Sequence, residues 1–240
     1  MRTASIWYYT ISFLFFFNIN SLKAQSLNDS IIKKVNAPLT IRFGIDLFQP
    51  ILGQFDKTLK GFEVVGDLKI KENIYLSTEL GSLRRTQQSE LINFTTSGKY
   101  FKIGFDLNMY KNWEGMNNQV YLGIRLASSL YEHNINNYTL YRTDQRFEYN
   151  IVETGYSTGK INDLNAQWVE FIVGMKVEVL KNTFMGLSIR LNRLTGYNMP
   201  KNFGLLYIPG FNRVTDENIF GSSFNYTLTY SIPFKLRKSN

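Results

Sequence analysis

Hydrophobic and polar residues alternate with a period of two along most of the chain after residue 38. Between 99 and 110, for example, Phe101 and Ile103 alternate with Lys102 and Gly104. This alternation places successive side chains on opposite faces of a β-strand, and no segment shows the helical period instead. The pattern predicts eight strands, over 39–48, 61–70, 74–83, 99–110, 119–130, 166–180, 183–194 and 219–234.

The links between these strands alternate between long and short. The long links are 49–60, 84–98, 131–165 and 195–218, and the short links are 71–73, 111–118 and 181–182. In an up-and-down order, all long links then lie at one end and all short turns at the other. Outer-membrane barrels have this arrangement, with strands of about ten residues that cross the bilayer at a tilt. The sequence therefore predicts an all-β, eight-stranded, antiparallel, up-and-down transmembrane β-barrel.

Charge is confined almost entirely to the less apolar face of the predicted strands. Only Lys99 and Arg193, both near external strand ends, lie on the apolar face, which therefore suits contact with lipid. An eight-stranded barrel is just wide enough to be filled by its own side chains. Because acids and bases nearly balance on the inner face, we predict a closed lumen held by salt bridges, with Arg125 and Arg190 as central members. The predicted lumen charge network is Arg42, Asp46, Glu63, Asp67, Lys69, Glu79, Lys102, Asp106, Arg125, Glu170, Lys176, Glu178 and Arg190.

Two other interpretations of the same alternation remain open. A small-solute pore would use the same barrel with an open lumen, although a selective pore more often shows an excess of one charge sign. A periplasmic, lipocalin-like carrier of an apolar ligand would turn the apolar face inward. Glycine on the polar face favours a narrow lumen over a solvent face, and thus the transmembrane barrel.

The N-terminal residues have the features of an export signal. Arg2 is followed by an apolar run at 11–17 and by a cleavage site after Ala24, and the run is too short to cross a bilayer as a helix. We therefore expect a signal peptide at 1–24, a flexible periplasmic leader at 25–38, the barrel domain at 39–234 and a periplasmic tail at 235–240. The expected location is the outer membrane.

The composition offers little for catalysis. The chain has no cysteine and one histidine, His133, which we interpret as a loop residue. The segment 155–161 has glycines and a lysine but lacks the spacing and the hydroxyl residue of a phosphate-binding loop. We predict no catalytic, cofactor-binding or metal site, no cofactor, and a protein that is not an enzyme.

The chain is basic, with a formal net charge of +8, but its cations are scattered and do not form a nucleic-acid-binding face. Eight of them lie at or beyond the predicted external strand ends, where contact with outer-membrane lipid phosphates is one hypothesis and ordinary solvation is another. They are Lys57, Lys60, Arg84, Arg85, Lys99, Arg193, Lys201 and Arg213.

The segment 205–211 is the most apolar stretch of the long links. An exposed apolar loop suggests a docking surface for a protein partner, with Tyr207, Ile208 and Phe211 as candidate residues. The alternative, which we favour slightly, is that the segment packs against its own barrel rim.

Several stretches resemble a known family: 60–63 (KGFE), 108–116 (NMYKNWEGM) and 206–213 (LYIPGFNR). The chain resembles a family of uncharacterised exported proteins from Bacteroidota, grouped as a domain of unknown function and predicted to be outer-membrane β-barrels. The resemblance covers nearly the whole chain after the signal, and it implies fold and location but no activity. From the predicted barrel and the lack of catalytic groups, we expect a role that is structural, adhesive, or accessory to a surface complex or secretion system.

Overall fold

A computed structural model describes residues 39–112, 116–141, 149–153, 159–198, 204, 206–213 and 219–234. The expected signal peptide at 1–24, the leader at 25–38 and the tail at 235–240 lie outside the described residues.

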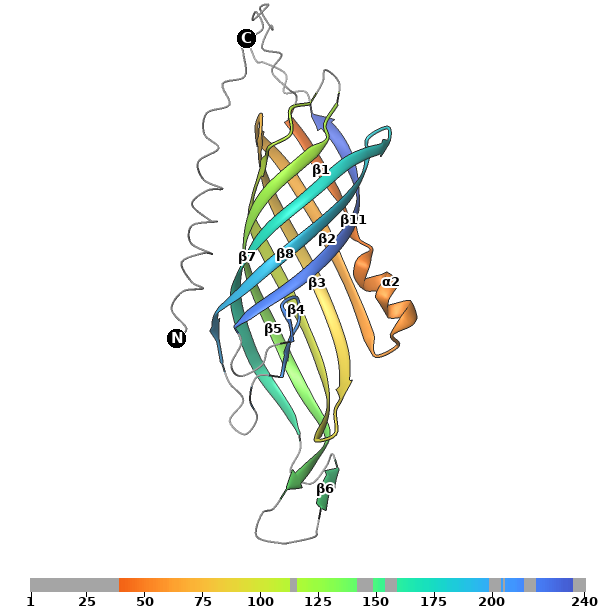
Figure 1. Ribbon diagram of the computed structural model, residues 1–240, viewed down its shortest axis with the longest axis vertical. Coiled ribbons are helices and arrows are strands. Elements are labelled where there is room, and N and C mark those ends of the chain that lie inside the picture. Colours follow the sequence, from red (N-terminus) through yellow and green to blue (C-terminus); the bar gives the residue numbers. More distant parts are fainter. Residues whose placement is uncertain are drawn as a thin grey trace, which may run out of the picture. The chain divides into compact units, whose positions relative to one another are not determined.

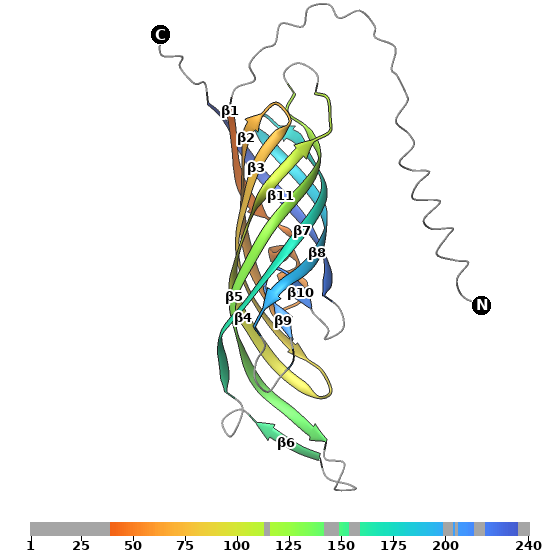
Figure 2. The same cartoon turned by 90° about the vertical axis from the view of Figure 1, so that its left-hand side faces the viewer.

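Eight long strands form a closed antiparallel ring (Figures 1 and 2). Each strand pairs with its neighbour in the chain, and β1 pairs with β11 to close the ring, from Leu39 opposite Phe234 to Asp46 opposite Thr227. The predicted eight-stranded, up-and-down antiparallel barrel is thus confirmed. The strands are β1 (Leu39–Asp46), β2 (Leu59–Lys71), β3 (Ile74–Gln88), β4 (Ile92–Asn108), β5 (Gln119–Tyr141), β7 (Lys160–Leu180), β8 (Thr183–Tyr197) and β11 (Phe220–Phe234).

The alternation in the sequence becomes an inside and an outside of the barrel. Apolar side chains such as Phe105 and Val173 remain 51% and 59% exposed on the outer wall, while Lys102 and Asp106, at alternate positions of β4, are buried in the lumen. Soluble proteins rarely expose a continuous apolar surface of this width to water. The exterior is therefore that of a transmembrane barrel, and an apolar-lined carrier is not the observed arrangement. We call this exposed outer band the apolar belt: Phe43, Phe62, Val64, Leu80, Phe101, Ile103, Phe105, Leu107, Val120, Leu122, Ile124, Leu126, Phe171, Val173, Met175, Leu187, Ile189, Leu191 and Phe224.

At the end that carries the long links, the strands extend further than the alternation predicted. After the expected orientation we call this end the external end, and we call the opposite end, with the short turns, the periplasmic end. β5 continues to Tyr141, β3 and β4 form a hairpin across the predicted loop 84–98, and β6 (Tyr149–Glu153) pairs with the outer part of β5. β5 and β6 project beyond the other strands in Figure 2. The two short strands β9 (Tyr207–Ile208) and β10 (Asn212–Arg213) form a separate hairpin.

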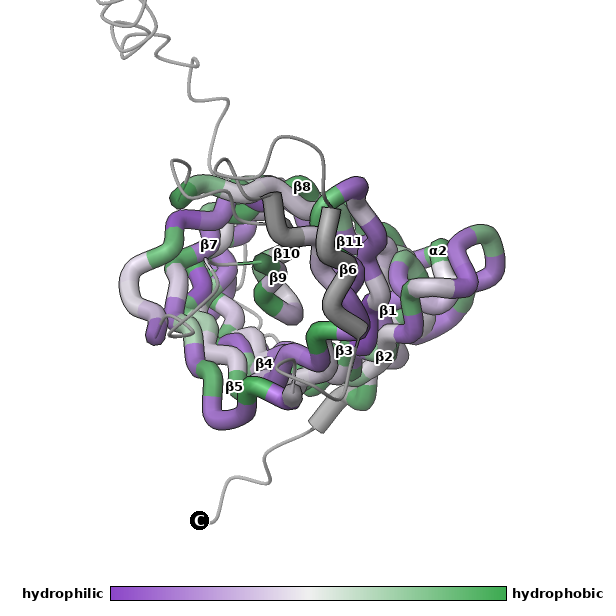
Figure 3. Tube along the Cα trace, turned by 90° about the horizontal axis from the view of Figure 1, so that it is seen from below, coloured by the Kyte–Doolittle hydropathy of each residue, from purple (hydrophilic) through white to green (hydrophobic). Residues whose placement is uncertain are grey.

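One helix interrupts the strands in the described part of the chain. The helix α2 (Phe48–Phe55) follows β1 and lies outside the ring (Figure 3), where the sequence predicted a loop. Its apolar residues Ile51, Leu52 and Phe55 are exposed, and Pro50 lies in the first turn, where proline is tolerated. Among the described residues, no helix combines the length and the apolar character that crossing a membrane requires.

β1 ends at Asp46, whereas its two neighbours β2 and β11 continue toward the external end. This leaves a gap between them. The Asp46 carboxylate accepts hydrogen bonds from the backbone N–H groups of Tyr226, at 3.0 Å, and Phe48, at 3.0 Å. It therefore caps the β1–β11 ladder where β1 leaves the sheet. Beyond that point no described strand lies between the external ends of β2 and β11, and α2 lies beside β2 at this position. We call this place the lateral gap.

Candidate functional site: the barrel lumen

The centre of the lumen holds a network of buried ion pairs. Arg190 on β8 binds Glu79 on β3 through two nitrogens, with Nη1–Oε2 at 2.5 Å and Nη2–Oε1 at 3.1 Å. The same guanidinium binds Glu170, with Nη1–Oε2 at 3.0 Å. Arg125 Nη2 lies 2.7 Å from Asp106 Oδ1. Because β3 and β8 are four strands apart in either direction around the ring, the Arg190–Glu79 pair spans the full width of the lumen.

Lys102 is shared by three carboxylates of this network. Its Nζ lies 3.1 Å from Glu170, 3.6 Å from Glu79 and 3.8 Å from Glu63. Neutral donors complete the set: Tyr100 Oη donates to Glu63 at 2.7 Å, and the Trp168 indole N–H donates to Glu170 at 2.7 Å. The carboxylates are thus held by several donors each, as buried charges require.

A second cluster lies nearer the periplasmic end. Asp67 on β2 accepts from Arg42 Nε at 2.6 Å and from Lys176 Nζ at 2.6 Å. Lys176 belongs to β7, which is again four strands from β2, so this pair also crosses the lumen. The Arg42 guanidinium lies over the rings of Tyr75 and Phe184, at 4.8 and 5.2 Å from their centroids. Ionic and aromatic groups together fill this part of the barrel.

Eleven of the thirteen residues of the predicted lumen network are buried. Lys69 and Glu178 are only partly buried near the periplasmic strand ends: Lys69 lies over Tyr75, and Glu178 accepts from the backbone N–H of Asn182 at 2.8 Å. Asp46 is buried but makes no ion pair with a described residue, since Asn225 and backbone N–H groups supply its donors. The remaining ten all take part in ion pairs: Arg42, Glu63, Asp67, Glu79, Lys102, Asp106, Arg125, Glu170, Lys176 and Arg190.

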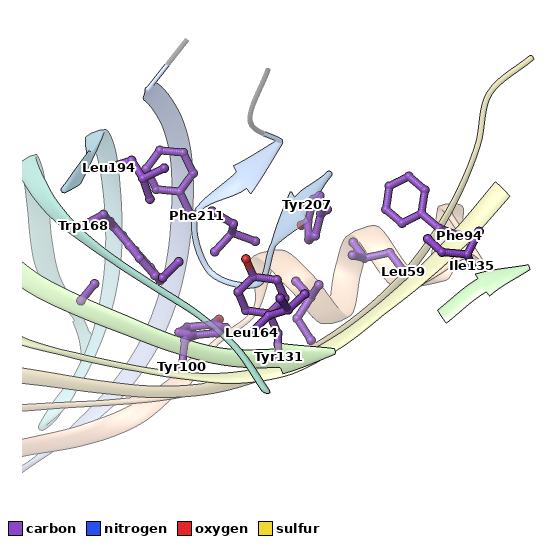
Figure 4. Close-up of a cluster of buried hydrophobic side chains, with 14 residues drawn as sticks. Leu59, Phe94, Tyr100, Tyr131, Ile135, Leu164, Trp168, Leu194, Tyr207 and Phe211 are labelled. Atoms are coloured by element: carbon purple, nitrogen blue, oxygen red, sulfur yellow. The ribbon is translucent and has the colours of Figure 1, made fainter. Parts of the chain in front are cut away.

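The external mouth of the lumen is filled by an apolar plug, which we define as residues 206–211. The turn between β9 and β10 lies inside the ring (Figure 3). There Phe211 packs edge-on against Trp168, with ring centroids 5.7 Å apart, beside Leu194 (Figure 4). Gly210 has a φ of +84° and lies against the Tyr100 ring, so that a side chain at this position would meet both backbone strain and a clash.

The three candidate docking residues are buried in the plug, so that the segment packs against its own barrel, as in the slightly favoured alternative. Tyr207, Ile208 and Phe211 are 1%, 0% and 0% exposed. They point into the barrel because the mouth offers a large apolar surface, formed in part by Leu59 and Leu83, that the plug can cover. Docking of a partner through these side chains would require the plug to leave the mouth.

A cavity of about 150 Å³ remains beneath the plug at the lateral gap. Its lining includes Leu52 of α2, Glu63, Arg85 and Tyr207. Gln49 of α2 reaches in and donates to Tyr100 Oη at 2.7 Å, passing over Gly61, where a Cβ would lie 2.2 Å from the Gln49 Oε1 atom. The helix therefore closes the lateral gap with one inserted polar side chain, a contact that the strand pattern gave no means to predict.

His133 is not a loop residue. It lies on β5, is completely buried, and its Nδ1 is 2.7 Å from the Thr96 hydroxyl, with the rings of Phe94 and Tyr131 beside it. Burial lowers the pKa of His133 to about 4. In the described part of the chain, no acid makes a hydrogen bond to this imidazole, and no group of three or more His, Asp or Glu could hold a metal ion.

The family described as Domain of unknown function (DUF6048) matches residues 4–237. Two crystal structures are similar in fold. The attachment invasion locus protein Ail of Yersinia pestis is 8% identical with a TM-score of 0.38, over 81% of this chain and 97% of that chain. Neisserial surface protein A (NspA) is 9% identical with a TM-score of 0.37, over 82% of this chain and 95% of that chain. No match was found among curated proteins. Because unrelated functions share folds, these likenesses carry no functional conclusion.

Proposed function

We propose that this chain, which belongs to the family Domain of unknown function (DUF6048), is an outer-membrane barrel whose lumen is closed. Its role is then structural, or accessory to a surface or secretion complex, and not enzymatic. The observation that carries this proposal is the Arg190–Glu79 ion pair, which joins opposite walls of the barrel with two hydrogen bonds.

The lumen contents support closure. A conducting channel needs a continuous aqueous path, and such paths belong to much larger barrels. In the part of the chain that the structure describes, the buried charges are six acids and five bases, close to neutrality, and two ion pairs span the lumen from opposite strands. An ion on this path would have to break charge-assisted hydrogen bonds inside a low-dielectric interior, which costs several kcal/mol.

The plug supports closure at a second level. A solute arriving from the external side meets Phe211 and Ile208, both fully buried, before it reaches the ion pairs. Opening would therefore require rearrangement of both the plug and the ion pairs. This double closure distinguishes the proposal from the small-solute pore.

The apolar belt supports the membrane location. A transmembrane barrel has an outward apolar band about 25 Å tall, which about ten residues of a tilted strand provide. On β7, Phe171, Val173 and Met175 continue this band to Val179 near the periplasmic turn. Export to the outer membrane also depends on the expected signal peptide, which lies outside the described residues.

Two measurements test the proposal separately. The protein should fractionate with the outer membrane, and recovery in the soluble periplasmic fraction would refute the location. Purified protein in planar lipid bilayers should show no steady single-channel current. A reproducible, ion-selective conductance from protein whose unheated gel mobility shows an intact barrel would refute closure and favour the pore.

The accessory role requires its own experiment. Tagged protein is purified from native outer membranes under mild detergent, and co-purifying proteins are identified at known stoichiometry. A stable partner present in near-equal amounts supports an accessory role in a complex. Purification of the barrel alone, with intact gel mobility, supports a structural role.

A further inference from the structure

Three cations form a row on the outer wall of the barrel, which we call the basic row. Lys60 on β2 and Arg84 on β3 are directly paired across the two strands. Lys99 on β4 lies opposite Ser82, two residues from Arg84 along β3. All three cations are exposed. Adjacent strands are about 4.8 Å apart, so the fold holds the three charges close together.

This arrangement is unfavourable for the barrel alone. Like charges directly opposite one another in an antiparallel pair destabilise the sheet. In the described part of the chain no ion pair joins the basic row to an acid. Glu132, the acid that the register brings closest to Lys99 on this face, pairs with Lys160 at 3.6 Å, and Asp56 accepts from Thr58. Within the described ranges, the row therefore lacks a counter-charge.

The basic row lies at the external edge of the apolar belt. Phe62 on β2, Leu80 on β3 and Phe101 on β4 are the exposed apolar residues that follow it toward the periplasmic end. The helix α2 lies beside β2 and outside the ring (Figure 3). Its residues Ile51 and Phe55 are exposed. With the belt in hydrocarbon, the three cations lie at the depth of the lipid headgroups, where cations attract anionic lipid.

We propose that Lys60, Arg84 and Lys99 bind phosphate monoester groups on the headgroup of an outer-leaflet glycolipid, whose acyl chains contact the apolar belt and α2. A phosphate monoester carries a charge of about −1.5 to −2, which matches three clustered cations better than the single charge of a phosphodiester. The arginine fork binds phosphate oxygens through two parallel hydrogen bonds, and the lysines act as point charges. The inference rests on the proposed membrane location but not on closure of the lumen.

The test measures lipid binding to the purified full-length barrel in a neutral detergent by native mass spectrometry. Four probes are compared: diphosphoryl lipid A, dephosphorylated lipid A, phosphatidylglycerol and phosphatidylcholine. Diphosphoryl lipid A should bind about tenfold or more tightly than each of the others, since the expected contacts are charge-assisted. Equal binding of phosphatidylglycerol, or of the dephosphorylated lipid, would overturn the proposal.

A matched pair of variants locates the site. Lys60→Gln/Arg84→Gln/Lys99→Gln removes the basic row, and Lys71→Gln/Lys111→Gln/Lys181→Gln removes the same charge from exposed lysines at the periplasmic end. Only the first variant should lose the tenfold preference, and equal loss in both would overturn the assignment. Unheated gel mobility reports barrel integrity, and membrane fractionation of the wild type reports the proposed location, so that failure of either is separated from failure of lipid binding.

Discussion

Arg190 and Glu79 lie on opposite walls of the barrel and meet at its centre through two hydrogen bonds, of 2.5 and 3.1 Å. The pair joins β8 to β3, which share no backbone hydrogen bonds. Side chains thus brace the ring across its diameter, in addition to the ladders around its circumference.

Replacing Arg190 with Met should lower the free energy of unfolding by about 3–5 kcal/mol, because Glu79 and Glu170 would stay buried with fewer counter-charges. Arg125→Met, which removes the partner of Asp106, should act in the same direction. Urea unfolding in lipid vesicles measures both effects. Arg193→Met, an exposed arginine on the same strand as Arg190, is the control and should change the value little. Equal losses of stability at 190 and 193 would contradict a stabilising role for the Arg190–Glu79 pair.

Shortening the plug side chains should destabilise the barrel. Tyr207→Ser or Phe211→Ser removes a fully buried ring, at a cost of about 3 kcal/mol each. The temperature at which the compact gel form is lost reports the change, and Tyr110→Ser, at an exposed ring, is the control. Unchanged stability together with loss of a co-purified partner would instead favour docking through the segment.

A methyl group at Gly104 should block barrel formation. A Cβ there would lie 1.8 Å from the Ile124 carbonyl oxygen, a backbone atom that cannot move aside without breaking the β4–β5 ladder. At Gly159 a Cβ has no atom within 4 Å. The yield of refolded, heat-modifiable barrel should therefore fall sharply for Gly104→Ala and stay normal for Gly159→Ala. Normal refolding of both would show that the strands can separate at this point.

His133 should make the barrel less stable in mild acid. Its pKa of about 4 in the folded protein is below the ordinary value of 6.5, so the unfolded chain binds the proton more readily. Stability from this group is fully present above about pH 6.5 and is lost as the pH falls toward 4, by about 3 kcal/mol in all. Carboxylates titrate in the same range, so the measured quantity is the difference between wild type and His133→Gln. A difference in stability that does not change with pH would refute the lowered pKa of His133.

The orientation predicts one-sided labelling. A cysteine at Asn137, exposed on the outer part of β5, should react with an impermeant thiol reagent on intact cells. A cysteine at Lys181, exposed in the β7–β8 turn, should not; the neighbouring Asn182 has a φ of +62° and is avoided for that reason. The native chain has no cysteine to add background. The reverse pattern would mean inverted insertion.

The sequence predicted the barrel because a period of two survives wherever one face of a strand meets lipid and the other meets charge. It failed where that contrast ends. The plug and the outer part of β5, including His133, are covered on the inside by apolar residues. There the polar or apolar character of a residue no longer indicates which face of the strand it occupies. The helix α2 has apolar residues at helical spacing, namely Phe48, Ile51, Leu52 and Phe55. This signal is weak because the helix has only eight residues and contains Pro50. No rule of alternation could assign which acid pairs with which base across the lumen.

Strand β1 has eight residues, whereas β5 has 23. Both ladders of β1 are therefore short, and one of them joins the first strand of the ring to the last. Local opening of a structure begins where the fewest backbone hydrogen bonds must break. In this barrel the easiest route from the ionic interior to the surrounding lipid is then sideways, through the departure of β1 and α2 together, and not along the axis through the plug. The ring thus consists of seven long strands that are closed by one short strand, β1.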